Sequence, residues 1–450
     1  MVRPASTAHV SRILEYCHHH NIGVVPQAGN TGLVGGSVGM DHEIIVSLER
    51  MHQIHGFVGP PGSSNNGMLR AQAGCILQDL QDFAARQGYM VPVDLGAKGT
   101  CQIGGNVSTN AGGSYYYRYG SLHATVLGLE VVLPNGSILN LGYEPTCHLK
   151  DNTGYDLKHL FIGAEGTLGI ITNVAILCPR LPPSKAAAFL ACEDYASVCK
   201  TLDLAKSELG EILAAFEFMD EHVLNMVQQQ QQQQSSTSGV LPLDRIYPYS
   251  ILVETHGSNE DHDQEKMQAF VEKAMAEGMV VDGALAQNLG QVEQFWATRE
   301  ACNPSVASQG YVYKYDVSLA VDEFSDFADE VRSSLQQQLS STSPTASTTA
   351  PPIVTNWGHV MDGNLHLNVV VPGVFERDND LYQRIENVVV DGIIQRSGSI
   401  SAEHGLGQYK NKHMTRIKDP ATLATMGAVK DLFDPNGIMN PGKYLPPTTI

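Results

Sequence analysis

Two histidines lie on either side of an Asp-Gly pair in residues 358–368, which read GHVMDGNLHLN. An Asp-Gly pair between apolar residues predicts a tight β-hairpin, because a type I′ turn needs positive φ at both central residues. If Asp362 and Gly363 form that turn, His359 lies opposite His366, with Cβ atoms roughly 4.5–5.5 Å apart. We therefore expect the two imidazoles to be close enough to bind one divalent ion.

A carboxylate and another imidazole are adjacent at Glu403 and His404, in the sequence SAEHGLG. Imidazole nitrogens with one carboxylate oxygen and an open coordination position are typical of a catalytic zinc site, and manganese or iron accepts the same ligands. Strand alternation also puts Asn368 on the same face as His366. Histidines at strand ends are often only hydrogen-bonded polar residues, but the number of candidate ligands favours a metal site.

Length and composition indicate a soluble globular protein of two or three domains, because the chain has 450 residues, 42% of them hydrophobic and 17% charged. A formal net charge of −19 argues against nucleic acids and anionic membrane surfaces as partners, although a local cluster of Arg and Lys could still hold an anionic substrate. The eight cysteines form no C-x-x-C pair and indicate buried or free thiols in a reducing compartment. No apolar run is long enough to predict a membrane span.

Three glycine-rich runs occur in the first 180 residues, at 27–37, 94–113 and 160–171. Backbone N–H groups that glycine leaves accessible, together with Thr and Ser hydroxyls, suit phosphate binding. The spacing matches neither a P-loop nor a Rossmann fingerprint. One such run is common without a ligand, but three in one block imply that several loops line one long phosphorylated cofactor.

The elements expected around these runs are short. Apolar spacing predicts a helix over residues 7–21 and a strand over 22–26, and a turn at 134–137 predicts a hairpin between strands 127–133 and 138–141. This block is therefore α+β. From Leu181-Pro182-Pro183 onward, longer helical and strand patterns with few glycines follow, and we place the domain boundary there.

Two low-complexity inserts interrupt the second half, at 228–238 and 336–352, and their polar composition predicts surface loops. Residues 296–300 are expected to end a helix. Residues 310–316 are expected to form a strand, with Lys314 on the face opposite its tyrosines. Arg299 and Lys314 are then cations that matter if an anion must be held, and otherwise they are solvated.

The ordered set of motifs resembles the FAD-linked oxidases of the vanillyl-alcohol-oxidase-like superfamily, and within it the D-2-hydroxyglutarate dehydrogenases. The likeness covers essentially the whole chain apart from the inserts. It rests on residues 26–37, 94–113, 118–121 (RYGS), 150–156 (KDNTGYD), 161–170, 358–368, 401–407, 440–441 and 445–446. The resemblance implies an α+β fold with a PCMH-type FAD-binding domain at 1–181. It also implies a substrate domain with an antiparallel sheet at 182–400 and a C-terminal segment, 401–450, that packs on both.

The resemblance also gives the three glycine clusters a common ligand, FAD. Some members attach FAD through a His in the first cluster, where this chain has Asn30 and Thr31, so we expect non-covalent FAD. The residues expected to bind it are Pro26, Gly29, Asn30, Thr31, Gly32, Gly35, Ser37, Pro92, Gly96, Gly104, Gly105, Asn106, Thr109, Asn110, Gly112, Gly113, Tyr119, Gly120, Glu165, Gly169, Ile170 and Asn440.

Carried over residue by residue, the resemblance implies a zinc site and a base. The zinc ligands are His359, His366 and Glu403, and the catalytic base is His404. The substrate-binding residues are Arg299, Asn303, Lys314 and Asn368. A hydride leaves the substrate carbon for flavin N5 as the hydroxyl loses its proton. Zinc lowers the pKa of that hydroxyl, an imidazole accepts the proton, and Arg fixes a carboxylate.

The chain departs from the family pattern at four places. Ala28 and Met361 stand where relatives usually have Gly. Asn303-Pro304 stands where close relatives have Thr and no proline, and we expect Pro304 to bend or end the helix. The first residues carry no leader signal, and Val2-Arg3-Pro4 matches a segment well inside relatives, which implies a missing N-terminal piece, including any mitochondrial leader.

The expected activity is oxidation of D-2-hydroxyglutarate to 2-oxoglutarate, with electrons passed to a protein or quinone acceptor such as electron-transfer flavoprotein. D-lactate or another D-2-hydroxy acid is the alternative substrate. A non-catalytic flavoprotein subunit and a zinc hydrolase without flavin are the rival classes. The resemblance implies the mitochondrial matrix, with the cytoplasm as alternative, and leaves the oligomeric state open, a homodimer being one option.

Overall fold

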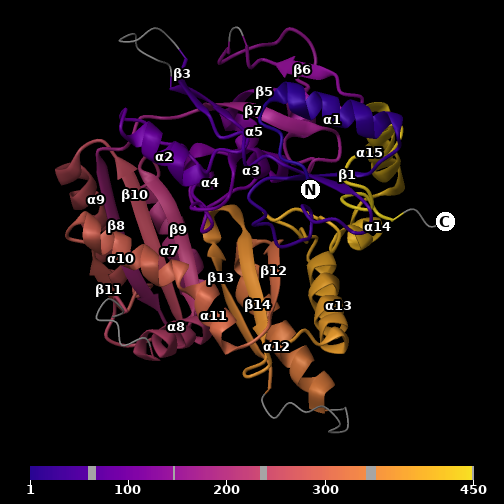
Figure 1. The fold of residues 1–450 in the computed structure, drawn as a ribbon. Helices are drawn as coiled ribbons and strands as arrows, with labels where there is room; N and C mark the ends of the chain where they lie inside the picture. Colours follow the sequence, from indigo (N-terminus) through magenta and orange to yellow (C-terminus); the bar gives the residue numbers. More distant parts are fainter. Residues whose placement is uncertain (59–66, 145–146, 234–240, 341–350, 448–450) are drawn as a thin grey trace. The chain divides into compact units, whose positions relative to one another are not determined.

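The computed structural model describes residues 1–58, 67–144, 147–233, 241–340 and 351–447 (Figure 1). The chain divides into two compact units, one formed by Met1–Leu181 with Glu403–Ile450 and the other by Pro182–Ala402. Both units combine helices with largely antiparallel sheets, so the α+β prediction is confirmed. Among the helices described, none has the length and apolar character needed to cross a membrane.

Unit 1 is built on a five-stranded antiparallel sheet in the order β3-β4-β7-β5-β6, and the two-stranded parallel pair β1-β2 lies apart from it. The strands are β1 (Val24–Gln27), β2 (Ile44–Ser47), β3 (Ile54–Phe57), β4 (Met68–Gln72), β5 (Val126–Val132), β6 (Ile138–Leu141) and β7 (Ile170–Leu177). The predicted hairpin is confirmed, because Val132 pairs with Ile138 across β5 and β6.

The helices of unit 1 are short. They are α1 (Thr7–His19), α2 (Leu77–Ala85), α3 (Ile103–Thr109), α4 (Tyr116–Tyr119), α5 (Leu122–Thr125), α6 (Lys158–Phe161), η3 (Asn411–His413), α14 (Met414–Ile417) and α15 (Pro420–Phe433). The predicted first helix is confirmed, and it begins where the Ser6 side chain accepts a hydrogen bond from the N–H of His9. Its Val10 and Leu14 are fully buried in one apolar core with the sheet.

Unit 2 is a seven-stranded antiparallel sheet in the order β11-β8-β10-β9-β13-β14-β12. Its strands are β8 (Ser184–Cys192), β9 (Leu213–Asp220), β10 (Tyr249–Gly257), β11 (Asp282–Leu285), β12 (Val312–Ser318), β13 (Ile353–His359) and β14 (Asn364–Val370). Its helices are α7 (Tyr195–Glu208), α8 (Glu221–Gln233), α9 (Glu260–Ala276), α10 (Leu289–Glu300), α11 (Cys302–Gln309), η1 (Val321–Glu323), α12 (Phe324–Ser340), η2 (Val360–Asp362) and α13 (Asn379–Gln395).

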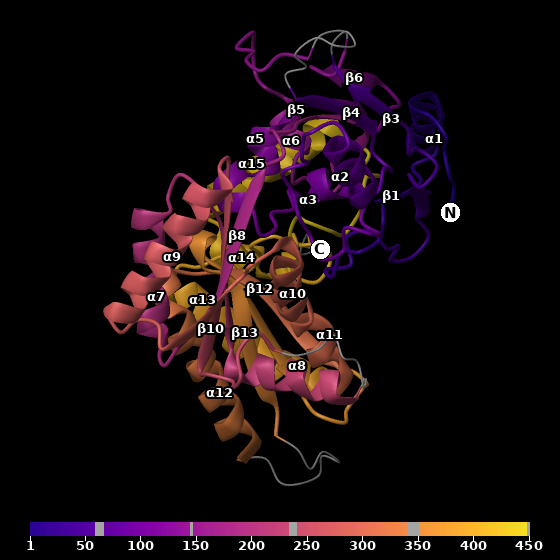
Figure 2. The same ribbon diagram turned by 90° about the vertical axis from the view of Figure 1, so that its left-hand side faces the viewer.

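Helices cover both faces of this sheet (Figure 2). On one face, apolar residues of α8, α10 and α11 pack on Met219, Leu252 and Trp357. On the other face, the ring of Phe218 lies against Tyr195 of α7 and Phe324 of α12. Since side chains alternate along a strand, Glu217 points to the same face as Met219, toward α10 and α11.

The prediction of surface loops at the two inserts is wrong in part. Residues 228–233 continue α8, because glutamine is a good helix former and the preceding turns are fixed by buried Val223 and Leu224. Residues 336–340 likewise continue α12. Residues 234–238 and 341–350 of the inserts lie outside the described part of the chain.

The predictions for residues 296–316 are confirmed. The helix α10 ends at Glu300, and α11 begins at Cys302 with Pro304 in its first turn, where a missing N–H costs no hydrogen bond. In β12 the side chains of Tyr313 and Tyr315 are buried, and Lys314 between them is exposed.

Candidate functional site

The two predicted metal-binding histidines are close together, although not in the predicted register. The rings of His359 and His366 have centroids 5.3 Å apart and meet edge to face. The expected direct pairing is wrong, because His359 pairs with Asn364 and His366 pairs with Trp357. The imidazoles are therefore diagonal neighbours on one face of the hairpin, which is still within the reach of long side chains.

A longer turn explains the shifted register. Val360 to Asp362 form a 3₁₀ turn, η2, and only Gly363 has positive φ, at +78°, so a two-residue type I′ turn is not formed. The turn buries Val360 completely and Met361 to 9% exposure. Met361, which departs from the family pattern, therefore contributes apolar burial that a glycine could not.

An acidic residue that the sequence did not single out lies beside these histidines. Asp316 of β12 is paired with His366 of β14, and its Oδ1 lies 3.7 Å from Nδ1 of His366. The same oxygen accepts a hydrogen bond of 2.7 Å from Nδ2 of Asn364. Imidazole nitrogens and a carboxylate oxygen are the donors that zinc, manganese and iron accept, so this cluster fits the ion that the family resemblance implies.

Glu217 of β9 is a second acidic residue that the sequence did not reveal. Its side chain is fully buried, and its Oε2 accepts a hydrogen bond of 2.7 Å from Nε of Arg299. Its Oε1 lies 3.5 Å from Nε2 of His359. The predicted substrate-binding arginine is therefore a buried member of an ion pair and not a solvated cation.

The other predicted substrate-binding residues lie on two elements. Lys314 pairs with Asn368 across β12 and β14, so both side chains project from the same face as His366. Asn368 is buried, and desolvation lowers the pKa of the Lys314 ammonium from its ordinary value. Asn303 lies in the first turn of α11 and is exposed. Unit 2 thus places His359, His366, Asn368 and Lys314 on one face of its sheet. Glu217 connects Arg299 to His359.

The predicted ligand Glu403 and base His404 belong to unit 1. They directly follow Ala402, the last residue of unit 2. The N–H of Ala402 donates a hydrogen bond of 3.3 Å to the carbonyl of Asp316. Within unit 1, the Oε1 of Glu403 accepts a hydrogen bond of 2.6 Å from the N–H of Gly113, a residue of the second glycine cluster.

The glycine clusters of unit 1 are packed too closely to tolerate side chains at several positions. A Cβ at Gly29 would lie 2.3 Å from the carbonyl oxygen of Thr100, and a Cβ at Gly104 would lie 2.5 Å from the Cβ of Ala73. A Cβ at Gly105 would lie 2.9 Å from the Cβ of Ala28. The methyl group of Ala28, where relatives usually have Gly, therefore occupies space that is free because residue 105 has no side chain. The first two clusters are therefore in direct contact.

Three buried amide oxygens at α3 have no hydrogen-bond partner among the described residues: Gln102 Oε1, Asn106 Oδ1 and Asn110 Oδ1. A buried acceptor without a donor costs free energy, so hydrogen bonds donated by a bound ligand would stabilise these three oxygens. The ribose and ribityl hydroxyls and the adenine amino group of FAD are donors of that kind. The residues present therefore fit FAD.

The remaining predicted cofactor residues lie in or near the three glycine-rich runs. Asn30 has φ of +52°, and its Oδ1 accepts a hydrogen bond from the Ser37 hydroxyl. A Cβ at Gly32 or Gly96 would face open space. Pro92 and Tyr119 line a cavity of about 500 Å³. The others lie within or beside these runs: Pro26, Thr31, Gly35, Thr109, Gly112, Gly120, Gly169 and Ile170.

Glu165 and Asn440 hold the loops together. Both carboxylate oxygens of Glu165 accept backbone hydrogen bonds, from the N–H groups of Leu406 and Gly407 at 2.7 and 2.8 Å, and burial raises its pKa. The Nδ2 of Asn440 donates to the carbonyls of Gly36 and Glu165. Lys443, which the sequence did not single out, donates to the carbonyls of Gly36 and Val38.

Comparisons with known proteins agree with this geometry. A family model described as an FAD-binding domain matches residues 1–142, and one described as the C-terminal domain of FAD-linked oxidases matches residues 181–444. The D-2-hydroxyglutarate dehydrogenase of Danio rerio is 44% identical over 446 residues, which cover 99% of this chain and 78% of that protein. The D-2-hydroxyglutarate–pyruvate transhydrogenase of Saccharomyces cerevisiae is 38% identical, over 98% of this chain and 85% of that protein.

The solved structures support the fold. The crystal structure of p-cresol methylhydroxylase with substrate bound aligns with a TM-score of 0.76 over 99% of this chain and 88% of that chain, at 14% identity. That likeness confirms the PCMH-type fold expected from the sequence. From the matching family models and the full-length relatives, the chain belongs to the D-2-hydroxyglutarate dehydrogenase family of FAD-linked oxidoreductases.

Proposed function

We propose that the chain is an FAD- and zinc-dependent dehydrogenase that oxidises D-2-hydroxyglutarate to 2-oxoglutarate. The observation that carries the proposal is the row of polar side chains on one face of the unit 2 sheet, where His359 lies next to His366 and His366 lies next to the pair of Lys314 and Asn368. Such a row offers metal ligands next to an ammonium for a carboxylate. A non-catalytic flavoprotein subunit would not need it.

In this proposal His359, His366 and Glu403 hold the zinc ion. The hydrogen bond between Ala402 and Asp316 supports the third ligand, because it fixes the residue before Glu403 at the edge of β12. When bound, zinc supplies a Lewis acid that lowers the pKa of the substrate hydroxyl. Asp316 orients His366 from β12, since its Oδ1 lies 3.7 Å from Nδ1 of that ring.

Four residues act on the substrate itself. Lys314 binds one carboxylate with its ammonium, which projects from the same face of the sheet as His366. The guanidinium of Arg299, which Glu217 orients, offers a planar fork to the other carboxylate. Asn368 donates from its amide. His404 is the base that accepts the hydroxyl proton as the substrate carbon is oxidised.

The loops of unit 1 hold FAD non-covalently, because Asn30 and Thr31 occupy the place where some members of the superfamily have an attaching His. The buried amide oxygens of Gln102, Asn106 and Asn110 support that binding. When bound, FAD supplies the acceptor of the hydride. Gly29, Gly104 and Gly113 let the loops that hold FAD pack closely against one another.

D-lactate is the second candidate substrate, and one observation favours it. The helix break before Pro304 leaves Asn303 exposed in the first turn of α11, whereas close relatives have Thr and no proline at these positions. Weaker binding of the distal carboxylate would reduce the preference for D-2-hydroxyglutarate, a dicarboxylate, over D-lactate, a monocarboxylate. Two basic residues, Arg299 and Lys314, still favour D-2-hydroxyglutarate.

We further propose that electrons pass to a protein or quinone acceptor, such as electron-transfer flavoprotein, and that the enzyme works in mitochondria. The support for the location is that curated relatives carry mitochondrial names. The Saccharomyces cerevisiae relative is named for transfer to pyruvate, which makes pyruvate the first alternative acceptor to test.

The test is anaerobic mixing of the FAD-loaded protein with a panel of D-2-hydroxy acids while the flavin absorbance is followed. We expect D-2-hydroxyglutarate to bleach the flavin faster, and at lower concentration, than D-lactate does. L-2-hydroxyglutarate is the matched control and should leave the flavin oxidised. Bleaching by D-lactate but not by D-2-hydroxyglutarate would show the substrate to be wrong, and a colourless protein with hydrolase activity would remove the flavin chemistry.

A further inference from the structure

Glu217 is an acid in the middle of β9, with apolar residues on both sides of it and Asp220 at the end of the strand. All residues of β9 are buried, and the Glu217 side chain has no exposed surface. Burying a carboxylate is costly unless it is paired, so an acid at this position needs a specific reason. One candidate reason is its position in the sheet, because Glu217 pairs with His359 across β9 and β13.

One oxygen of Glu217 has a full partner. Its Oε2 accepts the hydrogen bond of 2.7 Å from Nε of Arg299, near the end of α10. A guanidinium is planar, so a carboxylate that holds its Nε fixes the plane and the direction of the whole group. Glu217 therefore determines how Arg299 presents its remaining N–H groups.

The other oxygen of Glu217, Oε1, lies 3.5 Å from Nε2 of His359. It is buried, and no residue in the described part of the chain forms a hydrogen bond with it. An unsatisfied buried carboxylate oxygen is costly, and the nearby imidazole is the group that could satisfy it. Carboxylates beside metal-binding imidazoles commonly orient the ring and increase its basicity.

Docking of α10 on the sheet does not explain this arrangement. Glu254 of the adjacent strand β10 already anchors α10, since its Oε2 accepts a hydrogen bond from the indole of Trp296. Its Oε1 is bonded to Nε2 of buried His256 at 2.5 Å. Both oxygens of Glu254 are therefore used, whereas Glu217 keeps one oxygen directed at His359.

We propose that Glu217 is a positioning residue which ties Arg299 to His359, so that one buried carboxylate orients both the substrate-binding arginine and a metal-binding imidazole. This inference rests on the proposed function of the same site. It assigns Glu217 no contact with substrate or metal. It predicts that one substitution should weaken two different binding events.

The test is Glu217→Gln, which keeps the shape of the side chain and removes its charge. Zinc affinity is measured by competition with a chromogenic chelator. D-2-hydroxyglutarate affinity is measured from the concentration dependence of anaerobic flavin reduction. We expect zinc to bind about 10–100-fold more weakly and the substrate about tenfold more weakly, with the FAD content unchanged.

Glu254→Gln is the matched control. It makes the same chemical change in an equally buried carboxylate on the neighbouring strand, which contacts Trp296 and His256 in place of Arg299 and His359. We expect it to lower thermal stability without changing zinc or substrate affinity. An equal loss of both affinities in this control would overturn the proposal, because the effect would then be general.

Two further results decide the remaining cases. If Glu217→Gln does not fold, Glu217→Asp keeps the charge and shortens the reach, and it should weaken both affinities less. Wild-type affinities in either folded variant would overturn the positioning role while leaving the proposed function intact. If the wild-type protein itself binds no zinc and its flavin is not reduced by D-2-hydroxyglutarate, the proposed function fails and this inference fails with it.

Discussion

At the scale of the residue, His404 carries the proposed proton transfer. It follows Glu403, whose Oε1 accepts a hydrogen bond from the N–H of Gly113, so the backbone on its N-terminal side is held within unit 1. An imidazole is suited to this task because its ordinary pKa lies near neutral pH. The role therefore predicts a loss of rate without a loss of either bound group.

His404→Ala should keep zinc and FAD and slow flavin reduction by D-2-hydroxyglutarate about 10²–10⁴-fold, because a positioned general base contributes a factor of that size. Stopped-flow absorbance measures the rate, and metal analysis with the flavin spectrum measures the occupancy. His413→Ala, a change to a buried histidine of η3, is the control and should reduce its flavin at the wild-type rate. Reduction of His404→Ala at the wild-type rate would remove His404 as the base.

Single residues also show what the sequence could and could not reveal. The closeness of the His359 and His366 rings could be predicted from the Asp-Gly pair, but the register could not, because burial of Val360 and Met361 decided the turn. Glu217 could not be found, since its strand, LAAFEFMD, gives no local sign that an acid in it would face Arg299. Contacts between residues 82 positions apart depend on the tertiary fold.

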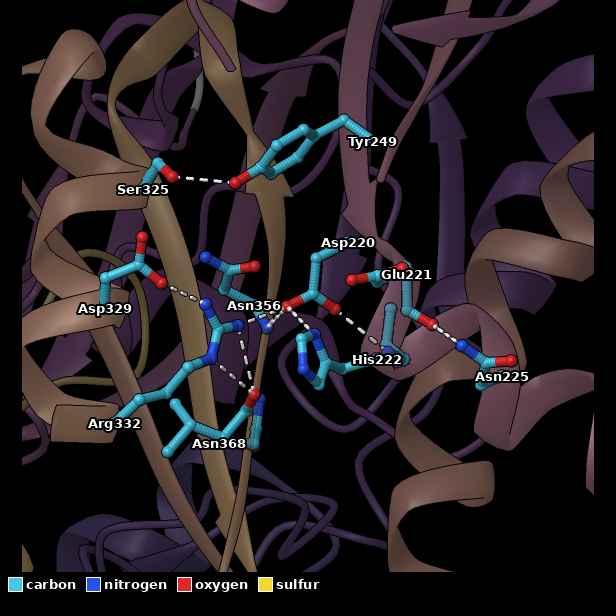
Figure 3. A network of polar contacts seen from close by, with 12 residues as sticks. Asp220, Glu221, His222, Asn225, Tyr249, Ser325, Asp329, Arg332, Asn356 and Asn368 are labelled. Atoms are coloured by element: carbon cyan, nitrogen blue, oxygen red, sulfur yellow. Dashed lines mark hydrogen bonds and ion pairs between the residues drawn. The ribbon is translucent and has the colours of Figure 1, made fainter. Parts of the chain in front are cut away.

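At the scale of the element, a second polar network joins α12 to the sheet of unit 2 (Figure 3). Asp220, at the end of β9, accepts hydrogen bonds from Arg332 of α12 at 2.7 Å and from the N–H of Asn356 in β13 at 3.1 Å. It also accepts one from the N–H of Val223 in α8. Burial raises the pKa of Asp220 to about 6, even though Arg332 opposes the shift.

Arg332→Met should therefore destabilise unit 2, because it leaves a fully buried carboxylate without its cation. We expect a loss of about 3–5 kcal/mol at pH 8. The loss should be smaller at pH 5, because Asp220, whose pKa of about 6 lies above that pH, is then mostly protonated in the folded state. The measurement is urea unfolding followed by tryptophan fluorescence, since both tryptophans, Trp296 and Trp357, lie in unit 2.

Asp329→Asn is the control for this prediction. Asp329 pairs with the same arginine at 2.7 Å, but its side chain is 63% exposed, so its ion pair is screened by solvent. We expect its unfolding midpoint to stay close to that of the wild type at both pH values. An Arg332→Met variant as stable as the wild type at pH 8 would contradict the role given to the network.

The ends of helices and strands agree with the sequence predictions where the local sequence pattern is strong. The apolar spacing from residue 7, the turn at residues 134–137 and Pro304 each marked a boundary that the structure has. The glutamine run failed as a loop signal, because its helix propensity prolongs α8 once Val223 and Leu224 have fixed the first turns. Composition alone does not distinguish a polar helix end from a loop.

At the scale of the whole molecule, the two units carry different parts of the proposed chemistry. The glycine clusters belong to unit 1, and His359 with His366 belongs to unit 2. Unit 1 is completed by the end of the chain, since the N–H of Val24 donates to the carbonyl of Ile438 and the N–H of Asn440 donates to the carbonyl of Val24. No local pattern in either segment could predict that pairing, because more than 400 residues separate the partners.

This division predicts the result of removing the metal. Treatment with a strong chelator should abolish flavin reduction by D-2-hydroxyglutarate and leave FAD bound, because the amides and glycines that fit FAD lie in unit 1 and the two imidazoles lie in unit 2. The flavin spectrum after gel filtration measures retention, and dithionite, which needs no substrate site, should still bleach the flavin. Added zinc should restore reduction by the substrate. Release of FAD on chelation, or an unchanged rate of reduction in metal-free protein, would contradict the assignment of the histidines to a catalytic ion.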